Sequence, residues 1–457
     1  MTPQNDDLNE ELRLRRQQRM ERRRQAEIER RKLYIRLACV AVVIVLVTVL
    51  IVVVSINGNP TPTQTDPIIG NDTTAAPPIS TDPPEQQTAS PETGGQTDPG
   101  QSGYMEETTV IHIAAAGDLN VTDEVVAQGM GTAGYDFSDA FLDVAPVLSD
   151  ADLTLLNFEG TLAGEPYGTK RGSPPLALAK QLAAMGVDAV QTANSASIRA
   201  GILGLESTIQ SFHSVGIATI GTFANRDDFR SSGGYTVLEI QGIRIALVAF
   251  TKGVDNLGLP EGSQDCVNLL YEDYTTDYKE IDTNGINKIL RAVREEQPDL
   301  TIAMLHWGSE YNEDVSSSQK RIANLMLDGG VDVILGTHSH LLQTIDFDEE
   351  EGTLVAYSLG DLYGDATTPG TNYSLILDLE ITRDNLTGET AVTGFDYTPI
   401  YTLRPEKSAA GGLRVVRIDH VLARYEANYL GKITDETKDA VEYALKRIGE
   451  RIVQELD

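Results

Sequence analysis

The chain has 457 residues, of which 41% are hydrophobic, and it carries a formal net charge of −32 at neutral pH. This hydrophobic content is enough for a sizeable core and excludes a chain that is disordered throughout. The strongly acidic composition argues against nucleic-acid binding, because contact with the phosphate backbone requires a basic surface.

A basic N-terminal segment precedes a long apolar run. Residues 1–36 hold eleven Lys and Arg residues against seven Asp and Glu residues, a net charge of +4, so the rest of the chain carries −36. Residues 37–56, LACVAVVIVLVTVLIVVVSI, contain no charge and are long enough to cross a hydrocarbon core. A buried globular helix of this length normally keeps a polar face, so we predict a transmembrane helix. The basic flank is better explained by the positive-inside rule than as a nucleic-acid-binding arm. The flank and the apolar run together predict a single-pass protein of the cell membrane, with a cytoplasmic N-terminus and an extracellular main domain.

The next segment, residues 57–108, is rich in Pro, Thr, Ser, Gly and Gln. It offers no periodic apolar residues to bury, so we predict a disordered, extended spacer. The chain has two cysteines, Cys39 in the predicted membrane helix and Cys266 in the body. This separation excludes a disulfide within the chain, and two cysteines make no thiol-ligated metal site.

From Val110 onward, short apolar runs alternate with segments of helical periodicity, which predicts an α/β domain over residues 109–400 with mostly parallel strands. Strands are predicted at 110–118, 152–160, 187–194, 217–222, 235–240, 243–250, 299–308, 331–340, 353–361 and 373–382. Helices are predicted at 173–186, 201–216, 282–297 and 317–330. The strands within 353–400 have no helices between them, which predicts an antiparallel part or a second sheet. Residues 401–457 form a C-terminal extension that ends in an amphipathic helix.

Residues able to bind metal gather after four of these strands. In open α/β sheets, ligands bind beyond the carboxyl ends of the strands. The residues found there are Asp118 and Asn120; Asn157 and Glu159; His306, Trp307, Glu310 and Tyr311; and His338 and His340. A single histidine in such a place is usually an ordinary polar loop residue, and the metal hypothesis depends on the whole set.

Imidazole and carboxylate ligands together suit Zn, Mn or Fe, so we predict one or two divalent ions at this edge. His338 and His340 form a His-x-His pair, which in an extended loop aims both rings to the same side. A carboxylate such as Glu159 can bridge two ions about 3.5–4 Å apart, an arrangement that clamps a phosphoryl group and activates water. The other histidines, His112, His213 and His420, lack this context and are predicted to be structural.

Several of these segments resemble the CapA family of bacterial capsule-synthesis, poly-γ-glutamate-associated proteins, which have a calcineurin-like metallophosphoesterase fold. In chain order they are AAAGDLN, LNFEGTLAG, AMGVDAVQTAN with GILGLEST, IQGIRIALVAFT, LHWGSEY, GTHSHLLQ and YSLGDL, within about residues 110–365. The resemblance implies two packed β-sheets flanked by helices. It also implies membrane anchoring outside the cell and a metal site made of Asp118, Glu159, His306, His338 and His340.

One stretch departs from the family pattern. Members usually show Ala-Asn-Asn-His followed by an Asp and a Gly, whereas residues 193–201 read ANSASIRAG. The second Asn, a metal ligand by the resemblance, is Ser195, and the His, a general acid by the resemblance, is Ala196. The Asp is replaced by Arg199. Loss of a positioned acid lowers a rate by on the order of 10²–10⁴, so metal binding can survive while catalysis is slow, altered or absent.

Asn194 and Arg199 remain as candidate catalytic residues in that stretch. A second departure lies at residues 358–361, where the family's Ser-Leu-Gly-Asn is Ser-Leu-Gly-Asp, so that Asp361 stands in place of the Asn. Arg171, Lys170 and Arg199 can orient an anionic substrate through charge-assisted hydrogen bonds, although ordinary surface charge is the simpler interpretation of all three. Supporting or substrate-contacting roles are predicted for Asn120, Asn157, Arg171, Trp307, Glu310 and Asp361.

Three functional hypotheses follow. The first is a metal-dependent, phosphoesterase-like hydrolase or transferase that acts on a cell-envelope polymer. The second is a catalytically inert module that holds poly-γ-glutamate or another polymer while membrane partners synthesise or export it. The acidic body argues mildly against the second, except in a local basic or metal-bearing pocket. The third, a structural protein that spans the cell wall, explains the anchor and spacer but not the clustered histidines and carboxylates.

Overall fold

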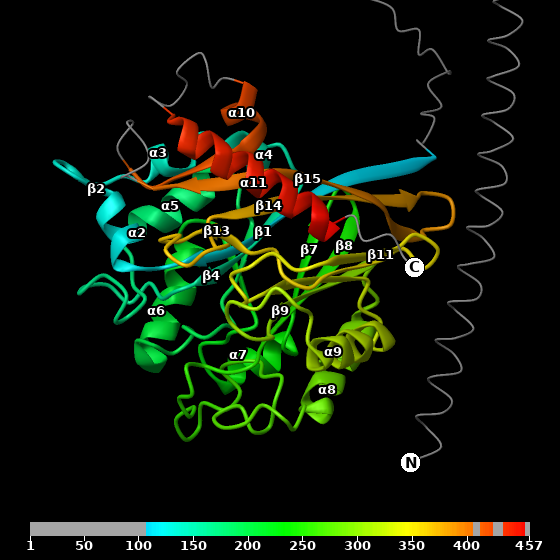
Figure 1. Ribbon diagram of the computed structural model, residues 1–457. Helices are drawn as coiled ribbons and strands as arrows, with labels where there is room; N and C mark the ends of the chain where they lie inside the picture. Colours follow the sequence, from blue (N-terminus) through cyan, green and yellow to red (C-terminus); the bar gives the residue numbers. More distant parts are fainter. Residues whose placement is uncertain (1–106, 405–411, 424–432, 453–457) are drawn as a thin grey trace, which may run out of the picture. The chain divides into compact units, whose positions relative to one another are not determined.

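Two β-sheets stack face to face in the part of the chain that the computed structural model describes, residues 107–404, 412–423 and 433–452 (Figure 1). The predicted basic segment, membrane helix and nearly all of the spacer fall on residues 1–106, outside the described ranges. Of the helices within those ranges, none combines the length and the apolar character needed to cross a membrane.

The first sheet is centred on β1, in the order β16-β15-β14-β1-β4-β5-β6. β4, β5 and β6 continue it in parallel on one side, and β14, β15 and β16 are antiparallel on the other. β13 pairs in parallel with the carboxyl end of β1. The strands are β1 Thr108–Asn120, β4 Leu153–Glu159, β5 Ala189–Gln191, β6 Ala218–Ile220, β13 Asp361–Tyr363, β14 Tyr373–Asp384, β15 Thr390–Leu403 and β16 Arg414–Arg417.

The second sheet has the order β11-β12-β10-β9-β8-β7. Its inner strands β8, β9, β10 and β12 are parallel, and antiparallel strands close both edges. β9 and β10 are buried at every residue, which explains their continuous apolar sequences. The strands are β7 Thr236–Ile240, β8 Ile243–Thr251, β9 Leu300–His306, β10 Val333–Thr337, β11 Ile345–Asp348 and β12 Thr353–Ala356. A small hairpin, β2 Met130–Gly131 and β3 Gly134–Tyr135, stands apart.

Apolar side chains fill the space between the sheets, and helices cover the outer faces. The inner core joins residues such as Leu155 and Leu377 of the first sheet to Leu247, Ile302 and Leu335 of the second. The outer cores lie under α2 to α6 and under α8 and α9. The helices are α2 Asp123–Gln128, α3 Ser138–Phe141, α4 Ala145–Ser149, α5 Leu176–Ala184, α6 Gly201–Ser214, α7 Arg226–Ser232, α8 Thr283–Glu296, α9 Ser317–Asp328, α10 Ile418–Ala423 and α11 Asp435–Ile452. The prediction of a mixed α/β fold with two sheets flanked by helices is confirmed.

The start of α9 shows how local sequence fixes a helix that covers the second sheet. Ser316 Oγ accepts a hydrogen bond from Gln319 N, and Gln319 Oε1 accepts one from Ser316 N, which together form a capping box. Ile322 and Met326 then face the sheet one turn apart, and both are fully buried. The helix therefore begins where the loop after β9 ends, and this loop borders the candidate site.

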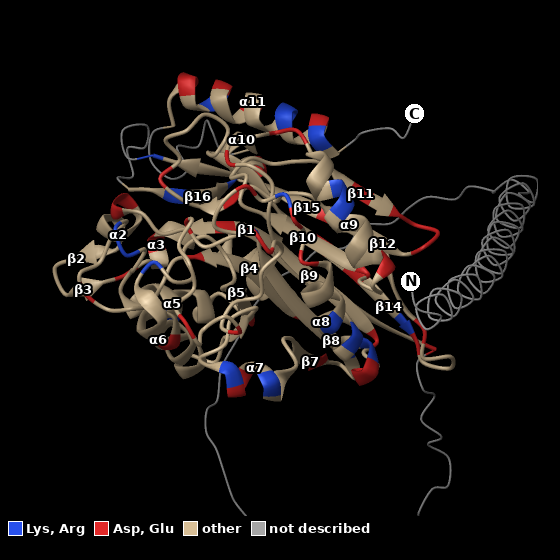
Figure 2. Cartoon of the chain, turned by 90° about the horizontal axis from the view of Figure 1, so that it is seen from below, with Lys and Arg blue, Asp and Glu red and all other residues tan. Residues whose placement is uncertain are grey.

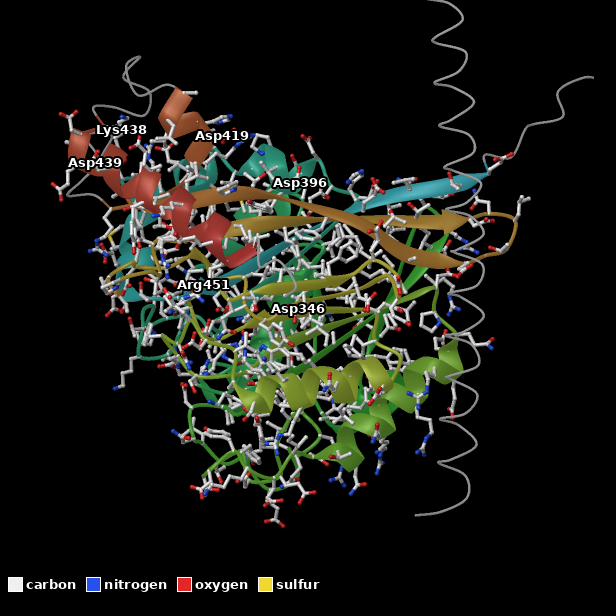
Figure 3. The ribbon with its side chains drawn as sticks, turned by 45° about the vertical axis from the view of Figure 1, so that its right-hand side comes forward. Asp346, Asp396, Asp419, Lys438, Asp439 and Arg451 are labelled. Atoms are coloured by element: carbon white, nitrogen blue, oxygen red, sulfur yellow. The ribbon has the colours of Figure 1, made fainter. Side chains whose placement is uncertain are left out.

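The C-terminal extension packs on the domain as the amphipathic pattern predicts. α11 contacts β14 and β15, and acidic and basic residues alternate along its exposed side (Figure 2). Lys438 lies near one end of the helix and Arg451 near the other (Figure 3). Arg447 Nη2 donates to Glu313 Oε2 at 2.8 Å, and Arg451 donates to the same carboxylate. α11 is thereby tied to the loop after β9.

Candidate metal centre

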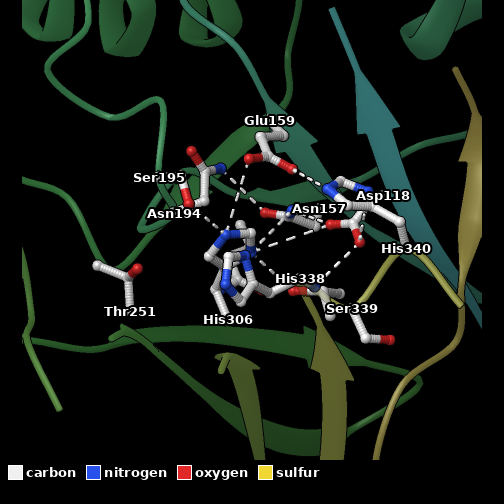
Figure 4. Close-up of polar contacts among 12 residues, drawn as sticks. Asp118, Asn157, Glu159, Asn194, Ser195, Thr251, His306, His338, Ser339 and His340 are labelled. Atoms are coloured by element: carbon white, nitrogen blue, oxygen red, sulfur yellow. Dashed lines mark hydrogen bonds and ion pairs between the residues drawn. The ribbon is translucent and has the colours of Figure 1, made fainter. Parts of the chain in front are cut away.

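The five predicted ligands converge at the edge where parallel strands of both sheets end (Figure 4). β1 and β4 of the first sheet supply Asp118 and Glu159, and β9 of the second sheet supplies His306. His338 and His340 lie in the loop that follows β10. All five side chains are buried. Their meeting follows from the topology, because the carboxyl ends of neighbouring parallel strands lie together at one edge.

Asp118 is the innermost carboxylate, and it lies within β1 rather than beyond its end. Its Oδ1 accepts a hydrogen bond from Asn157 Nδ2, and its Oδ2 accepts one from the backbone N–H of His338 at 3.0 Å. The preceding residue is Gly117, where a Cβ would come within 1.8 Å of Gly360 O. Only glycine allows this close approach, which positions Asp118 N to donate to Gly360 O at 2.9 Å.

Glu159 faces two histidines without a hydrogen bond to either. Its Oε1 is 3.8 Å from His306 Nε2, and its Oε2 is 3.7 Å from His340 Nε2 (Figure 4). Oε2 is buried and has no hydrogen-bond partner among the described residues. A buried carboxylate oxygen without a partner is costly, so this atom calls for a ligand.

His306 is fully buried, with each ring nitrogen next to a hydroxyl group. Nε2 is 2.9 Å from Ser195 Oγ, and Nδ1 is 3.2 Å from Thr337 Oγ1. A hydroxyl can donate or accept, so neither contact fixes the tautomer. The contact with Ser195 connects His306 to the turn after β5, where the sequence departs from the family pattern.

The His-x-His loop has a different backbone from the extended one predicted. His338 and His340 both have positive φ, 90° and 58°, so the expectation of an extended loop is wrong. Such conformations cost about 1–3 kcal/mol each in non-glycine residues, and surrounding contacts must hold them. Ser339 Oγ donates to Leu341 O at 2.6 Å, and Asp361 Oδ1 lies 2.8 Å from His340 Nδ1. Through its left-handed residues, the loop places the His340 ring beside Asp361 and the His338 ring beside His306, with a distance of 4.4 Å between the His338 and His306 ring centroids.

Burial and mutual charge shift the protonation of the cluster. Burial raises the pKa of Asp118 to about 6 and that of Glu159 to about 8, although His340 lowers both. Burial alone would lower the pKa of His340, but Asp361 and the other two carboxylates outweigh it and hold the pKa well above its usual value. Burial lowers the pKa of His306 far below its usual range and that of His338 to about 3. These two rings are therefore neutral and carry a lone pair for a metal.

The donor set fits a divalent metal ion. Two groups of three side chains bring one ligand atom each within 4.8 Å of one another: Asp118, His340 and Asp361, and Asp118, Glu159 and His306. Asp118 belongs to both. The partnerless Glu159 Oε2 and His338 Nδ1 are both buried at this place. Imidazole nitrogens and carboxylate oxygens are the ligands of Zn, Mn and Fe sites, so these residues can hold such an ion.

The turn after β5 contributes differently from the family pattern. Asn194 Nδ2 donates to Asn157 Oδ1 at 3.0 Å and to Phe158 O at 2.7 Å, while its Oδ1 accepts from Ala196 N. This amide thus holds the turn against β4. Ser195 turns its hydroxyl to His306, and the buried methyl group of Ala196 offers no proton. A catalytic role for Asn194 stays a prediction.

The remaining predicted residues lie around this cluster in different roles. Trp307 is fully buried and donates its indole N–H to Tyr357 O at 2.8 Å, so it packs behind His306 and cannot touch a substrate. Arg171 donates to Glu165 O at 3.0 Å, and within the described chain it has no polar contact with the five candidate ligands. Asn120 is half-buried at the end of β1, and Glu310 is exposed in the loop after β9.

Two cations lie near the cluster, and the sequence analysis identified only one. Arg199 Nε donates to Asp255 Oδ2 at 2.7 Å, and its positive charge lowers the pKa of Glu159 in part. The missed residue is Lys252, which follows β8 and whose charge lowers the pKa values of His306 and His338 beyond the effect of burial. Its position directly after an apolar strand was the available signal, because β8 ends at the same edge as β9.

The structure thus has a mixed α/β fold with a buried cluster of Asp, Glu and His side chains at its strand ends, and this cluster can hold a divalent ion. Residues 112–366 match the family described as bacterial capsule synthesis protein PGA_cap. They form more than half of the chain, which therefore belongs to this family. The resemblance inferred from the motifs is thus confirmed.

Two curated relatives come from Bacillus. The PGA biosynthesis protein CapA of Bacillus subtilis (strain 168) is 25% identical over 301 residues, which cover 65% of this chain and 73% of that protein. The capsule biosynthesis protein CapA of Bacillus anthracis is 25% identical over 260 residues, which cover 55% of this chain and 59% of that protein. The chain thus spans less than two thirds of the second relative.

Similar solved structures include a phosphatase from Mycoplasma pneumoniae, with 15% identity and a TM-score of 0.42 over 64% of this chain and 94% of that one. Another is the calcineurin-like phosphoesterase YfkN from Bacillus subtilis, with 14% identity and a TM-score of 0.40 over 75% of this chain and 98% of that one.

Metal binding is expected to release protons near neutral pH. With a pKa of about 8, the Glu159 carboxyl is mostly protonated in the metal-free chain, and a metal binds only its ionised form. Binding therefore releases about one proton or more, and affinity rises as the pH rises toward that pKa. Calorimetric titration of the full chain with Mn²⁺ in two buffers of different ionisation enthalpy measures this release. Binding heats that do not depend on the buffer would contradict it.

Proposed function

We propose that this chain is a membrane-anchored extracellular protein of capsule or poly-γ-glutamate synthesis, which uses a centre of one or two Mn, Zn or Fe ions. Membership of the capsule synthesis family supports the polymer assignment, together with the names of both Bacillus relatives. The apolar run at 37–56 and the basic flank before it support the anchor and the orientation. The physiological partners are the polymer itself and the membrane proteins that synthesise or export it.

One observation carries the metal-dependent part of the proposal. Glu159 reaches the interface of the two sheets with a buried, partnerless oxygen, and a histidine from the second sheet lies within 4 Å of each of its carboxylate oxygens. A purely structural cluster would pair these groups by hydrogen bonds, as Asp361 does with His340 at 2.8 Å. The longer spacing around Glu159 leaves room for an ion.

The residues divide into holding and positioning groups. Asp118, Glu159, His306, His338 and His340 would hold the metal, which when bound supplies a Lewis acid and a water molecule of lowered pKa. Asn157 fixes Asp118 through its amide, and Asp361 fixes the ring of His340. Such partners orient ligands and set their basicity. The reaction class that this arrangement supports is phosphoester hydrolysis or transfer on a cell-envelope polymer or its precursor.

The turn at Ser195 and Ala196 favours a second candidate, an inert polymer-binding module. Neither side chain is a general acid near neutral pH. The amide group of the neighbouring Asn194 already donates its hydrogen bonds to residues of β4. In this alternative the metal serves to bind an anionic polymer and no bond is broken. The two candidates agree on metal binding and differ on turnover.

The metal assignment predicts that Glu159→Gln loses the ion. Gln keeps the shape but removes the charge, so we expect affinity for Mn²⁺ to fall by at least about tenfold. Metal analysis and Mn²⁺ titration of the full chain in detergent measure this. Glu239→Gln, at an exposed position of β7, is the matched control and should bind as the wild type does. A wild-type chain that retains no divalent ion, or a Glu159→Gln chain that retains it fully, would refute the assignment.

Restoring the family residues should separate the two candidates. Ser195→Asn with Ala196→His reintroduces a ligand and a proton donor, and we expect hydrolysis of a generic phosphodiester to rise by on the order of 10²-fold. The same double variant with His306→Ala should lose that gain, which controls for a contaminating enzyme. No gain in a folded, metal-loaded double variant would mean that this turn does not border a catalytic site.

The anchor predicts that the main domain is reachable from outside the cell. Protease added to intact cells that express the full chain should digest the part beyond residue 107, because a single-pass protein with a basic cytoplasmic end exposes it there. Immunoblotting with an antibody against the domain gives the readout. Digestion only after cell lysis would overturn the orientation.

A further inference from the structure

Lys252 is a half-buried lysine fixed beside the His306 strand. It follows β8, and its backbone N–H donates to His306 O at 2.8 Å. Its Nζ donates to Gly308 O at 2.7 Å and lies 4.5 Å from the ring centroid of Tyr278. The carbonyl and the ring hold the ammonium group next to the backbone that leaves the metal centre.

This ammonium has unused binding capacity. An ammonium group has three N–H donors, and the described residues provide one hydrogen-bond acceptor for Lys252 and no carboxylate within ion-pair distance. Burial lowers its pKa, and Glu310 offsets this in part. Proteins usually pair a charge that leaves water, so an unpaired half-buried lysine next to a functional centre is suited to a ligand of opposite charge.

Arg199 is held in a comparable way on the turn that departs from the family. Its backbone N–H donates to Ala196 O at 2.9 Å, and its Nε binds Asp255 at 2.7 Å. That ion pair uses one edge of the guanidinium group, and in the described chain the two terminal nitrogens have no hydrogen-bond partner. The side chain is 23% exposed. A guanidinium with free terminal N–H groups binds carboxylate or phosphate oxygens in a bidentate manner.

Both cations are connected to His306, one through the strand and one through the ring. Lys252 lies next to His306 along the second sheet, and Arg199 belongs to the turn whose Ser195 contacts the ring. The two side chains thus belong to segments that contact the same histidine, Lys252 through its own backbone and Arg199 through its turn.

We propose that Lys252 and Arg199 form an anion-binding subsite beside the metal centre, which orients a phosphate or carboxylate group of the substrate. The inference rests on the proposed function and deepens it, because it names an oxyanion as the recognised group. Two fixed positive charges at this place compensate for the lost imidazole as a source of positive charge, though not as a proton donor. The subsite would also provide a local positive charge at which this otherwise strongly acidic domain binds an anionic polymer.

The test is anion binding by the metal-loaded full chain in detergent. Inorganic phosphate and glutarate are titrated separately by calorimetry, which distinguishes a phosphoryl group from a carboxylate group. We expect Lys252→Met and Arg199→Met each to weaken the binding of at least one anion by about tenfold, the usual loss for a charged hydrogen bond. Metal content should not change, because neither residue is a metal ligand.

Matched controls exist for both cations. Lys288 lies over the ring of Phe229 at 5.5 Å, and Arg226 Nε binds Asp265 at 2.7 Å, so each copies one local arrangement away from the centre. Lys288→Met and Arg226→Met should leave anion affinity unchanged. Lys252→Arg keeps the charge and should retain binding, which separates loss of charge from loss of folding if the Met variant is unstable.

Two results would overturn the subsite. The first is wild-type affinity for both anions in folded Lys252→Met and Arg199→Met chains. The second is a wild-type chain that holds its metal but binds neither anion. The metal content of the wild type reports separately on the proposed function, so a metal-free wild type defeats the metal centre as well. Failure of the subsite alone leaves metal content intact.

Discussion

The buried carboxylate of Asp118 is the constraint on which the site depends. One oxygen accepts from Asn157 of the same sheet, and the other accepts from the backbone of His338 in the loop of the second sheet. It therefore joins the two sheets where their parallel strands end. Gly117 makes this possible, because any side chain there would meet Gly360 O. The left-handed backbone of the His-x-His loop is supported partly by this contact, and the metal-binding geometry follows from it.

In the proposed site, the residues that would hold a metal are distinct from the turn after β5, where the sequence departs from the pattern that the family resemblance implies. Ligands from β1, β4, β9 and the loop after β10 are all present and buried. On the other side Ser195 and Ala196 replace an amide and an imidazole, while Arg199 and Lys252 supply positive charge. Outside the family-matched residues, α11 binds Glu313 in the loop after β9 and so braces one border of the centre.

Much of this could be predicted from the sequence, and the gaps have physical causes. The strands β1, β4, β8, β9 and β14 and the helices α6, α8 and α9 carry strong periodic signals, and each was predicted within a few residues. The three-residue β13 and the short helices α2, α3 and α4 were not predicted as separate elements, because they contain too few residues for a period. The 14-residue β15 was predicted only as part of the helix-free region 353–400. The ligands were predicted because strand topology brings strand ends together. The positive φ values of His338 and His340 depend on tertiary contacts that no local pattern encodes. For Lys252 the sequence shows the position after an apolar strand, but the contact of its Nζ with Gly308 O depends on the tertiary fold.

The most direct test of the central claim is an anomalous diffraction map of the protein crystallised with Mn²⁺. The account predicts a peak beside the partnerless oxygen of Glu159, bounded by His306 and His340 and absent in Glu159→Gln. A second peak near Asp118 and Asp361 would indicate a two-ion centre. A map with no peak among these residues, or with Mn²⁺ only on exposed carboxylates, would contradict the metal centre on which the proposed function rests.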